Sequence, residues 1–374
     1  MIKIKIAYMF GGMNRGGAET IMLDVFCNWR NAPFEFIGVH RKDGTMHDAF
    51  YSAGPKLYQL APKRFRYVRY LQQLRRLIKS ENITTVHAQH WLDAIYAWIA
   101  TIGMHVQLVT TLHGFYPMTG LNGLLCRMSI RMADDVCFVS RYEQEWYQHR
   151  MQIPEAKCHV IYNGVDYAKF DEVSIDLMEL KNEGCIKFCM VGNFMSGRDH
   201  DTLVRAMLLL HQRGISDFEF YFIGKRSDAE PQLYDECEQI CQLNNMEHVH
   251  FLGARSDVPA LLKSMDGFVY STAHDTFGIS IVEAMYAGLP VVVNDWPVMK
   301  EVCGEAEKNA ITYFKSKDVV DCAAAIEKLL QDLTKSTPDL KKRCAHNAQW
   351  VRDRYSIVSY IIRLADIYGN RRIN

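Results

Sequence analysis

The segment 274–290, HDTFGISIVEAMYAGLP, holds two carboxylates whose spacing suits recognition of hydroxyl groups. Asp275 lies in a glycine-bearing loop after an apolar run, and Glu283 lies about one turn inside a short helix that a glycine and a proline terminate. Residues 277–279 begin this helix, so their backbone N–H groups can bind a phosphate or a sugar hydroxyl. Acids beside such a helix end suit the hydroxyls of ribose and a hexose better than phosphate. A capping acid followed by a surface glutamate is an equally good interpretation of the spacing alone.

Two other loops between a predicted strand and a predicted helix suit an anion. Gly16 and Gly17 open an apolar helix and permit close approach of backbone N–H groups to an anion or sugar, although a tight turn without ligand fits equally. This loop has neither the glycine register of a dinucleotide site nor the Lys-Ser/Thr pair of a P-loop. Arg198 stands just before the helix DTLVRAMLLLHQRG, where its guanidinium can meet a phosphate. The acids Asp199 and Asp201 are interpreted as capping and solvated residues rather than metal ligands.

A regular alternation of strands and helices must position these loops. Short apolar, β-rich runs alternate with helix-period segments, which predicts parallel sheets covered by helices. Two such series meet near residues 164–185, where the chain becomes acidic and irregular. We therefore expect an α/β protein with two Rossmann-like domains, a cleft between them, and ligands at the carboxyl ends of the strands. The predicted strands lie in IKIKIAYMF, FEFIGVH, TTVHAQH, VQLVTTL, DDVCFVS and CHVIYN, then in IKFCMVG, FEFYFIG, HVHFLG, GFVYS and PVVVND.

The composition excludes several classes of protein. A chain of 374 residues, 49% apolar and 23% charged, suits two soluble domains. Its apolar runs stay below the roughly 18 residues that span a bilayer, and MIKIKIAYMFGG resembles a strand more than a signal peptide. Eleven scattered cysteines favour a reducing cytosol over a disulfide framework. The balance of 43 basic and 43 acidic residues gives a general nucleic-acid role no support.

One segment, residues 56–80, departs from this balance because it has eight Lys or Arg residues and no acid. Its apolar residues fall at helical spacing, which predicts a helix with one apolar and one basic face. A surface helix packed on a sheet is the simpler interpretation. The alternative is attraction to an anionic membrane surface or to a phosphate-bearing acceptor. The apolar positions are Tyr67, Tyr70, Leu71, Leu74, Leu77 and Ile78.

In sequence, HDTFGISIVEAMYAGLPVVVND resembles the Glu-x7-Glu signature of retaining glycosyltransferases with the GT-B fold, a large family that includes bacterial polysaccharide, mannosyl and glucosyl transferases. The likeness covers nearly the whole chain, and the order of its motifs makes it specific. The other motifs are RGGAE, TTLHG at 110–114, VSRYEQEW at 139–146, IYNGVDYAKF at 161–170, VGNFMSGRDHDTLVRAM and VHFLGARSDVPALLKSMDGFVYST.

The resemblance implies a division of the chain and roles for the residues noted above. An acceptor-side domain would comprise residues 1–165 together with a C-terminal segment, 355–374, that crosses back, and a donor domain would comprise residues 166–354. Glu283 would bind the ribose and Asp275 the hydroxyls of the donor sugar. The backbone of Phe277, Gly278 and Ile279 would contact sugar and phosphate.

The resemblance also implies a basic clamp on the diphosphate. Arg198 stands where the family usually has a lysine, and Asn193 stands where an arginine is common. Gly16 and Gly17 would approach the donor phosphate from the other domain, and His113 would lie beside the reacting sugar. Arg198, Asp275 and His113 thus form the expected catalytic set, and Leu252–Arg255 would flank the base.

The implied reaction is transfer of a hexose from a nucleotide diphosphate sugar to a hydroxyl with retention at the anomeric carbon, in cell-surface polysaccharide or glycolipid synthesis. It needs no cofactor and no metal. The acceptor would be a saccharide or a lipid-linked sugar, and the enzyme would be cytoplasmic or peripheral at the inner face of the membrane. A nucleotide-sugar 2-epimerase shares this fold, and a silent nucleotide-sugar-binding subunit is a further alternative. A nicotinamide oxidoreductase is disfavoured by the missing glycine register.

Two departures from the family pattern bear on activity. Asp275 is one methylene shorter than the usual glutamate, so it reaches differently and can favour another donor hydroxyl pattern. Asn193 cannot neutralise charge, which leaves Arg198, the helix end and the glycine loop to stabilise the leaving diphosphate. His87 and His90 are candidates for acceptor contact, although buried or capping roles fit them better.

Overall fold

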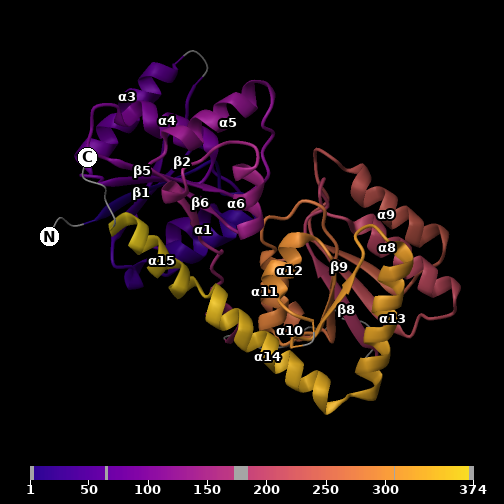
Figure 1. Ribbon diagram of the computed structural model, residues 1–374. Helices are drawn as coiled ribbons and strands as arrows, with labels where there is room; N and C mark the ends of the chain where they lie inside the picture. The colour runs from indigo at the N-terminus through magenta and orange to yellow at the C-terminus, as the bar shows by residue number, and fades with distance from the viewer. Residues whose placement is uncertain (1–3, 64–65, 172–183, 307, 370–374) are drawn as a thin grey trace. The chain divides into compact units, whose positions relative to one another are not determined.

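A computed structural model describes residues 4–63, 66–171, 184–306 and 308–369. The chain divides into two compact units (Figure 1). Unit 1 comprises Met1–Asp166 and Tyr355–Asn374, and unit 2 comprises Tyr167–Arg354. Each unit is an α/β structure built on one parallel sheet.

Unit 1 has a seven-stranded parallel sheet in the order β3-β2-β1-β4-β5-β6-β7. The order reverses beside β1, which pairs with β2 on one side and with β4 on the other, where Tyr8 lies opposite His87. The strands are β1 (Lys5–Phe10), β2 (Glu35–His40), β3 (Leu57–Gln59), β4 (Thr85–Ala88), β5 (Gln107–Leu112), β6 (Asp135–Phe138) and β7 (Cys158–Val160).

Helices on both faces of this sheet bury its side chains, because strands of a parallel sheet are apolar on both sides. Helix α4 contacts both α3 and α5, and α15 contacts α1 (Figure 1). The helices are α1 (Gly17–Cys27), α2 (His47–Ser52), α3 (Tyr67–Ser80), α4 (Trp91–Thr101), α5 (Gly120–Met132), α6 (Arg141–Gln148) and α15 (Ile357–Gly369), with short 3₁₀ turns η1 (Trp29–Asn31) and η2 (Glu155–Lys157).

The last described helix, α15, is an integral part of unit 1. Tyr368 is fully buried and its hydroxyl lies 2.6 Å from Nδ1 of His87. Backbone hydrogen bonds join Val165 to Tyr355 and to Ile357, so the two segments of unit 1 are tied together where each meets unit 2. Residues 370–374 lie outside the described residues.

Unit 2 has a six-stranded parallel sheet in the order β10-β9-β8-β11-β12-β13. The strands are β8 (Ile186–Val191), β9 (Phe218–Ile223), β10 (Val249–Gly253), β11 (Gly267–Tyr270), β12 (Val291–Asn294) and β13 (Ile311–Phe314). The helices are α7 (Ala168–Asp171), α8 (His200–Gln212), α9 (Gln232–Leu243), α10 (Val258–Lys263), α11 (Ile279–Tyr286), α12 (Pro297–Cys303), α13 (Val319–Lys335) and α14 (Pro338–Tyr355). On one side α8 packs between α9 and α13, and α10 and α12 both contact α11 (Figure 1).

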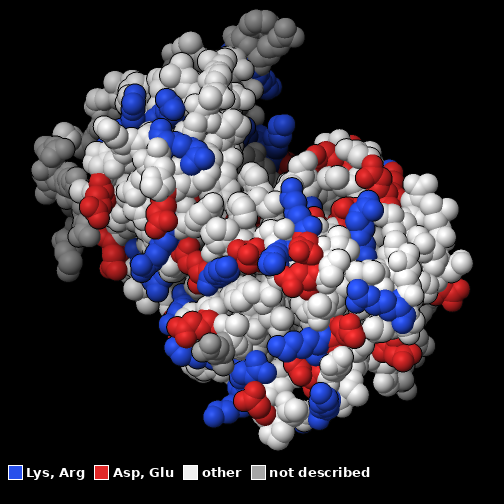
Figure 2. Space-filling view, turned by 45° about the vertical axis from the view of Figure 1, so that its right-hand side comes forward, with Lys and Arg blue, Asp and Glu red and all other residues white. Residues whose placement is uncertain are grey.

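The predicted fold class is confirmed, and each predicted strand contains an observed one. Two strands were not predicted, β3 with three residues and β13 with four. Within the described ranges, no helix combines the length and the apolarity needed to cross a bilayer. Figure 2 shows basic and acidic side chains interspersed over the face that it draws.

The amphipathic helix predicted within residues 56–80 is observed as α3. Tyr70, Leu74 and Ile78 are buried as expected, but Tyr67, assigned to the apolar face, is 51% exposed. It lies in the first turn of the helix, before the helix meets the core. Residues 64–65 of the basic segment lie outside the described residues.

Candidate functional site

The candidate site of unit 2 lies where its strand order reverses, between β8 and β11. Arg198 comes from the loop after β8 and Asp275 from the loop after β11. The Nε atom of Arg198 lies 3.2 Å from Oδ1 of Asp275. Open α/β sheets bind ligands at this point, because the loops diverge there at the carboxyl ends of the strands. The structure thus brings together two residues that the sequence analysis assigned to the diphosphate and the hexose.

Gly197 joins the two loops. Its carbonyl oxygen accepts hydrogen bonds from the backbone N–H of Ala273 at 2.9 Å and from the hydroxyl of Thr272 at 3.1 Å. Its φ of +93° favours glycine, and a Cβ at this position would lie 2.5 Å from Cβ of His274. The loops can therefore approach this closely only with glycine at position 197.

Asp275 is held rigidly by its neighbours. The hydroxyl of Tyr270 donates to Oδ2, while Arg198 contacts Oδ1. The backbone of Asp275 is fixed as well, because its N–H donates to Oγ1 of Thr272 at 3.1 Å and its carbonyl accepts from Nε1 of Trp296 at 2.9 Å. The carboxylate is thus preorganised, with 16% of the side chain exposed.

Arg198 is held as a permanent cation. Burial opposes its charge, but Asp275 and Tyr270 outweigh this and raise the pKa of the guanidinium above its ordinary value. The guanidinium carbon lies 5.4 Å from the centroid of the Tyr270 ring. A Cβ added to Gly192 would lie 2.3 Å from Nη1 of Arg198. The guanidinium therefore fits in this position only because residue 192 is glycine.

The residues after Arg198 have structural roles. Asp199 accepts from the hydroxyl of Ser271 at 2.7 Å and from that of Thr202 at 2.9 Å, which connects the start of α8 to the residue that follows β11. His200 stacks on Phe194 with ring centroids 3.8 Å apart. Burial and Arg198 lower the pKa of His200 to about 3, so this histidine is neutral at physiological pH.

The N-terminus of α11 lies in the same loop as Asp275. Gly278 is the N-cap residue of the helix, with φ +89°, and it provides no side-chain hydrogen bond to the first amides of the helix, which can therefore bind a ligand. Ile279 is the first helical residue, as predicted, and Phe277 is 2% exposed. Glu283, one turn into α11, is 8% exposed, and its Oε1 lies 3.2 Å from Nζ of Lys169 in α7.

Asn193 supports the loop after β8 through its side chain. Its Oδ1 accepts from the backbone N–H of Lys225 at 2.9 Å. The two cations that follow β9 are also engaged, because Lys225 pairs with Asp228 and Arg226 with Asp235, each at 2.6 Å. Of these three cations, Arg198 is the one whose partner, Asp275, lies in the loop that leads into α11.

The remaining predicted residues, Gly16, Gly17 and His113, belong to unit 1. Gly16 precedes the first turn of α1 with an extended backbone, and a Cβ there would meet Oε2 of Glu19 at 2.6 Å. His113 follows β5, and its Nε2 lies 2.9 Å from Oε1 of Gln89. An amide oxygen only accepts, so this Nε2 carries the proton. Burial and the neighbouring His90 lower the pKa of His113 to about 4.

The two histidines that were candidates for acceptor contact have internal roles. His87 is fully buried, with Nδ1 at 2.6 Å from the Tyr368 hydroxyl and Nε2 at 2.7 Å from that of Thr111. Nδ1 of His90 accepts from the backbone N–H of Leu92 at 3.1 Å and so caps α4. The simpler interpretation of both residues is confirmed.

Several residues of the unit 2 site escaped the sequence analysis. Trp296 and Lys169 act through partners distant in the chain, Asp275 and Glu283. Tyr270 and Gly192 lie within six residues of their partners, but their residue types do not indicate these contacts. The buried Asn294 was the clearest clue in the sequence, because it is the one polar residue in the apolar strand VVVN. Its Oδ1 accepts from the backbone N–H of Thr272, and its Nδ2 donates to the carbonyl of Thr272 at 2.7 Å.

Solved structures show which class of fold the two units form. A glycosyltransferase from Rickettsia africae has a TM-score of 0.82 and 16% identity, with 99% of this chain and 98% of that chain covered. The Anabaena protein HepE, solved in complex with UDP-glucose, has a TM-score of 0.82 and 17% identity, with 98% and 100% covered. The fold is therefore GT-B.

Residues 15–169 match the family model described as Glycosyltransferase Family 4, and residues 177–350 match that of the group 1 glycosyl transferases. The chain belongs to this family of retaining, metal-independent glycosyltransferases, and it transfers a sugar from a nucleotide sugar.

Curated relatives carry more specific names. A Campylobacter jejuni N,N'-diacetylbacillosaminyl-diphospho-undecaprenol α-1,3-N-acetylgalactosaminyltransferase is 27% identical over 301 residues, 74% of this chain and 75% of the relative. An Escherichia coli UDP-Gal:α-D-GlcNAc-diphosphoundecaprenol α-1,3-galactosyltransferase is 22% identical over 100% of this chain and 98% of the relative.

Proposed function

We propose that the protein transfers a hexose from a UDP-sugar to a hydroxyl of a lipid-linked saccharide, and that the unit 2 site holds the donor. The carrying observation is the Arg198–Asp275 pair, 3.2 Å apart, beside the uncapped N-terminus of α11. The choice of UDP is supported by HepE, which was solved with UDP-glucose. The choice of acceptor is supported by the two relatives whose names specify diphospho-undecaprenol acceptors.

The arrangement assigns each group in unit 2 a role toward the donor. Arg198 and the backbone of Phe277, Gly278 and Ile279 bind the diphosphate, because cations and helix N-termini attract phosphate. Asp275 accepts from hydroxyls of the hexose. Glu283 accepts from the ribose hydroxyls while Lys169 balances its charge.

The reaction breaks the bond between the anomeric carbon and the diphosphate oxygen as the acceptor hydroxyl forms its new bond on the same face of the sugar. The hydroxyl proton passes to the departing phosphate. Arg198 stabilises the negative charge that develops on the diphosphate, and it does so without reorganising, because Asp275 fixes its Nε. Its raised pKa keeps this charge present throughout the physiological pH range.

The family resemblance assigns Gly16 and Gly17 to donor binding and His113 to the transferred sugar, and the proposal keeps these roles. His113 is neutral at pH 7, so it acts as a hydrogen-bonding group and not as a cation. Asn193 contributes by holding the loop that presents Arg198, through its hydrogen bond to Lys225.

Acceptor recognition involves an anionic membrane surface reached through residues 56–80. Along α3 the side chains of Arg66, Arg69, Arg76 and Lys79 are exposed, and Val68 is 70% exposed. Arg75 does not belong to this surface, because its Nη1 donates to the carbonyls of Ala100 and Ile102 at 2.8 Å and so caps the end of α4.

The donor assignment is tested by Arg198→Ala. A panel of nucleotide sugars is first screened for thermal stabilisation of the wild type, because differential stabilisation reports the donor directly. The kcat/KM of Arg198→Ala with that donor should then fall by an amount equivalent to about 2–4 kcal/mol of transition-state stabilisation. This is the usual effect of losing one charge-assisted contact. Arg205→Ala is the matched control, since Arg205 lies on α8 but is 52% exposed and pairs only with Asp201 in the described structure. Unchanged turnover in Arg198→Ala would contradict the proposal.

The membrane assignment is tested by pelleting with vesicles that contain or lack an anionic phospholipid. Charge reversal at Arg76 and Lys79 should reduce pelleting with the anionic vesicles. The control is charge reversal at Lys341 and Lys342, which are exposed in α14. Equal pelleting of the two variants would rule out α3 as the contact surface.

A further inference from the structure

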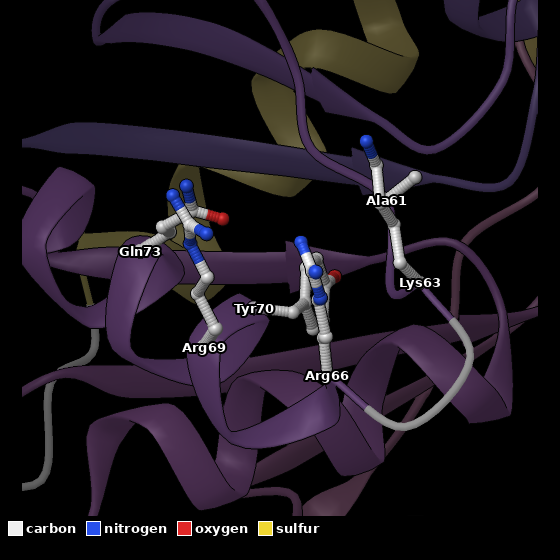
Figure 3. A pocket seen from close by; sticks show the side chains of 6 residues that line it. All are labelled: Ala61, Lys63, Arg66, Arg69, Tyr70 and Gln73. Carbon is white, nitrogen blue, oxygen red and sulfur yellow. The ribbon is translucent and has the colours of Figure 1, made fainter.

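A basic pocket lies at the start of α3, in unit 1. It is lined by Ala61, Lys63, Arg66, Arg69, Tyr70 and Gln73 and encloses about 160 Å³. Figure 3 shows Arg69 rising from the first turn of α3, and Arg66 and Lys63 from the segment before the helix, with all three side chains extending to the same side. We call this group of six residues the α3 pocket.

The cations of the α3 pocket are uncompensated. Across the described part of the chain, no carboxylate pairs with Lys63, Arg66 or Arg69. The sequence offers no local partner either, because residues 56–80 include no acid. Like charges gathered around one cavity repel each other, so this arrangement gains stability when an anion enters.

Tyr70 supplies a second, independent indication of a ligand. Its side chain is 2% exposed, and within the described residues its hydroxyl has no hydrogen-bond partner. A buried hydroxyl without a partner is unfavourable, and it is satisfied when a ligand oxygen accepts its proton. Burial raises the pKa of Tyr70 well above its ordinary value, so the hydroxyl remains a donor.

Two charged residues outside the pocket act on Tyr70, and they leave the field of the pocket positive. Asp93 and Arg41 act electrostatically on Tyr70, but they pair with each other, with Nε of Arg41 at 2.8 Å from Oδ1 of Asp93. Their charges therefore largely cancel at the pocket. The net contribution comes from Lys63, Arg66 and Arg69.

We propose that the α3 pocket binds a phosphate or diphosphate group, with Lys63, Arg66 and Arg69 as cationic donors and the Tyr70 hydroxyl as a buried neutral donor. Guanidinium groups match phosphate geometry through paired N–H donors, and Gln73 adds an amide at the rim. The group belongs either to the diphosphate of a lipid-linked acceptor or to a phospholipid headgroup. The site is independent of the donor site, since its residues lie in unit 1 and do not include Arg198 or Asp275.

The test is calorimetric titration of the full-length protein with inorganic pyrophosphate in an Arg198→Ala background, which weakens the proposed donor site. Arg66→Gln with Arg69→Gln should lower pyrophosphate affinity by at least about tenfold, because hydrogen bonds to charged groups are strong. Arg76→Gln with Lys79→Gln is the matched control, since it removes the same charge from the same helix outside the pocket. Equal affinity in the two double variants would overturn the proposal.

Tyr70→Phe provides a second test that does not depend on charge. It removes only an unpartnered hydroxyl, so the melting temperature should hold or rise while pyrophosphate affinity falls several-fold. A fall in melting temperature with unchanged affinity would mean that the hydroxyl serves the fold, and the proposal would fail.

Vesicle pelleting then separates the two sources of the phosphate. If the pocket binds a phospholipid headgroup, the Arg66→Gln, Arg69→Gln variant should pellet with phosphatidylglycerol vesicles less than the Arg76→Gln, Lys79→Gln variant does. Equal pelleting, together with the loss of pyrophosphate affinity, assigns the pocket to the acceptor diphosphate. Failure of the Arg198→Ala test would leave these measurements unaffected, because they need no turnover.

Discussion

Arg198 and Asp275 share a third residue, Tyr270, whose hydroxyl donates to the carboxylate of Asp275 and whose ring lies beside the guanidinium of Arg198. Tyr270 is the last residue of β11, so a residue of the sheet, and not only the two loops, holds Arg198 and Asp275 in position. A carboxylate held from both sides in this way has little freedom to move toward a donor. Its length therefore sets which sugar hydroxyls it reaches.

Asp275→Asn should lower kcat by roughly 100-fold with the preferred donor, since it removes the negative partner that orients Arg198. Asp275→Glu should instead change the ranking of hexose donors, because the longer acid displaces either the Tyr270 hydroxyl or Arg198. Steady-state kinetics with several nucleotide hexoses measure both effects. Asp201→Asn serves as the control, because it breaks an exposed Asp–Arg pair on α8. An unchanged donor ranking in Asp275→Glu would refute the length argument.

Gly192→Ala should reduce turnover without touching any ligand. The added Cβ would lie 2.3 Å from Nη1 of Arg198, so the guanidinium must move, and a displacement of about 1 Å can cost on the order of 100-fold. The measurement is kcat/KM alongside the melting temperature. Gly369→Ala is the comparison, since a Cβ there has no neighbour within 4 Å. Full activity in Gly192→Ala would show that the position of Arg198 is not critical.

Glu283→Gln should raise the KM for the nucleotide sugar more than it lowers kcat, because the ribose is remote from the bond that breaks.

Lys169→Met should weaken folding by about 1–3 kcal/mol, because it leaves the largely buried Glu283 without its partner. Combining the two substitutions should recover part of that stability, which urea unfolding would detect. Strictly additive effects would show that Lys169 and Glu283 do not interact.

Acid should destabilise unit 1 through His87. Burial lowers the pKa of His87 to about 3, so between about pH 6.5 and pH 3 the unfolded chain binds a proton that the folded protein does not. Stability is therefore complete above about pH 6.5 and falls as the pH decreases, by up to about 1.4 kcal/mol per unit for this one residue. Urea unfolding between pH 5 and pH 8 should show a shallower pH dependence for His87→Gln. Parallel curves for the two proteins would contradict this assignment.

The parts of the fold that were predictable are those with local signals. The β-rich runs before glycine-bearing loops located most strands, and the Gly-Leu-Pro sequence after Tyr286 marked the end of α11. The start of α11 at Ile279 was also predicted, because Gly278 punctuates the loop. In contrast, β3 has only three residues, too few for a periodic pattern.

The contacts within the site were less predictable, because side-chain partners depend on tertiary structure. Arg75 belongs to the basic segment 56–80, yet it caps α4 by donating to the carbonyls of Ala100 and Ile102. Glu283 was expected to bind the ribose, but its pairing with Lys169 was not predicted. Sequence spacing tells which face of a helix a residue occupies, and the partner on that face comes from elsewhere in the chain.

The backbone hydrogen bonds that join Val165 to Tyr355 and Ile357, at the junction of α14 and α15, have a consequence for synthesis on the ribosome. Unit 2 is a continuous segment and can fold as soon as Arg354 has emerged, whereas unit 1 must wait for α15. Until then, His87 lacks Tyr368, and the apolar face that Leu364 and Tyr360 cover stays open to water. The first domain to be translated is thus the last to be completed. Truncation within α15 should therefore trap unit 1 unfinished while leaving unit 2 folded.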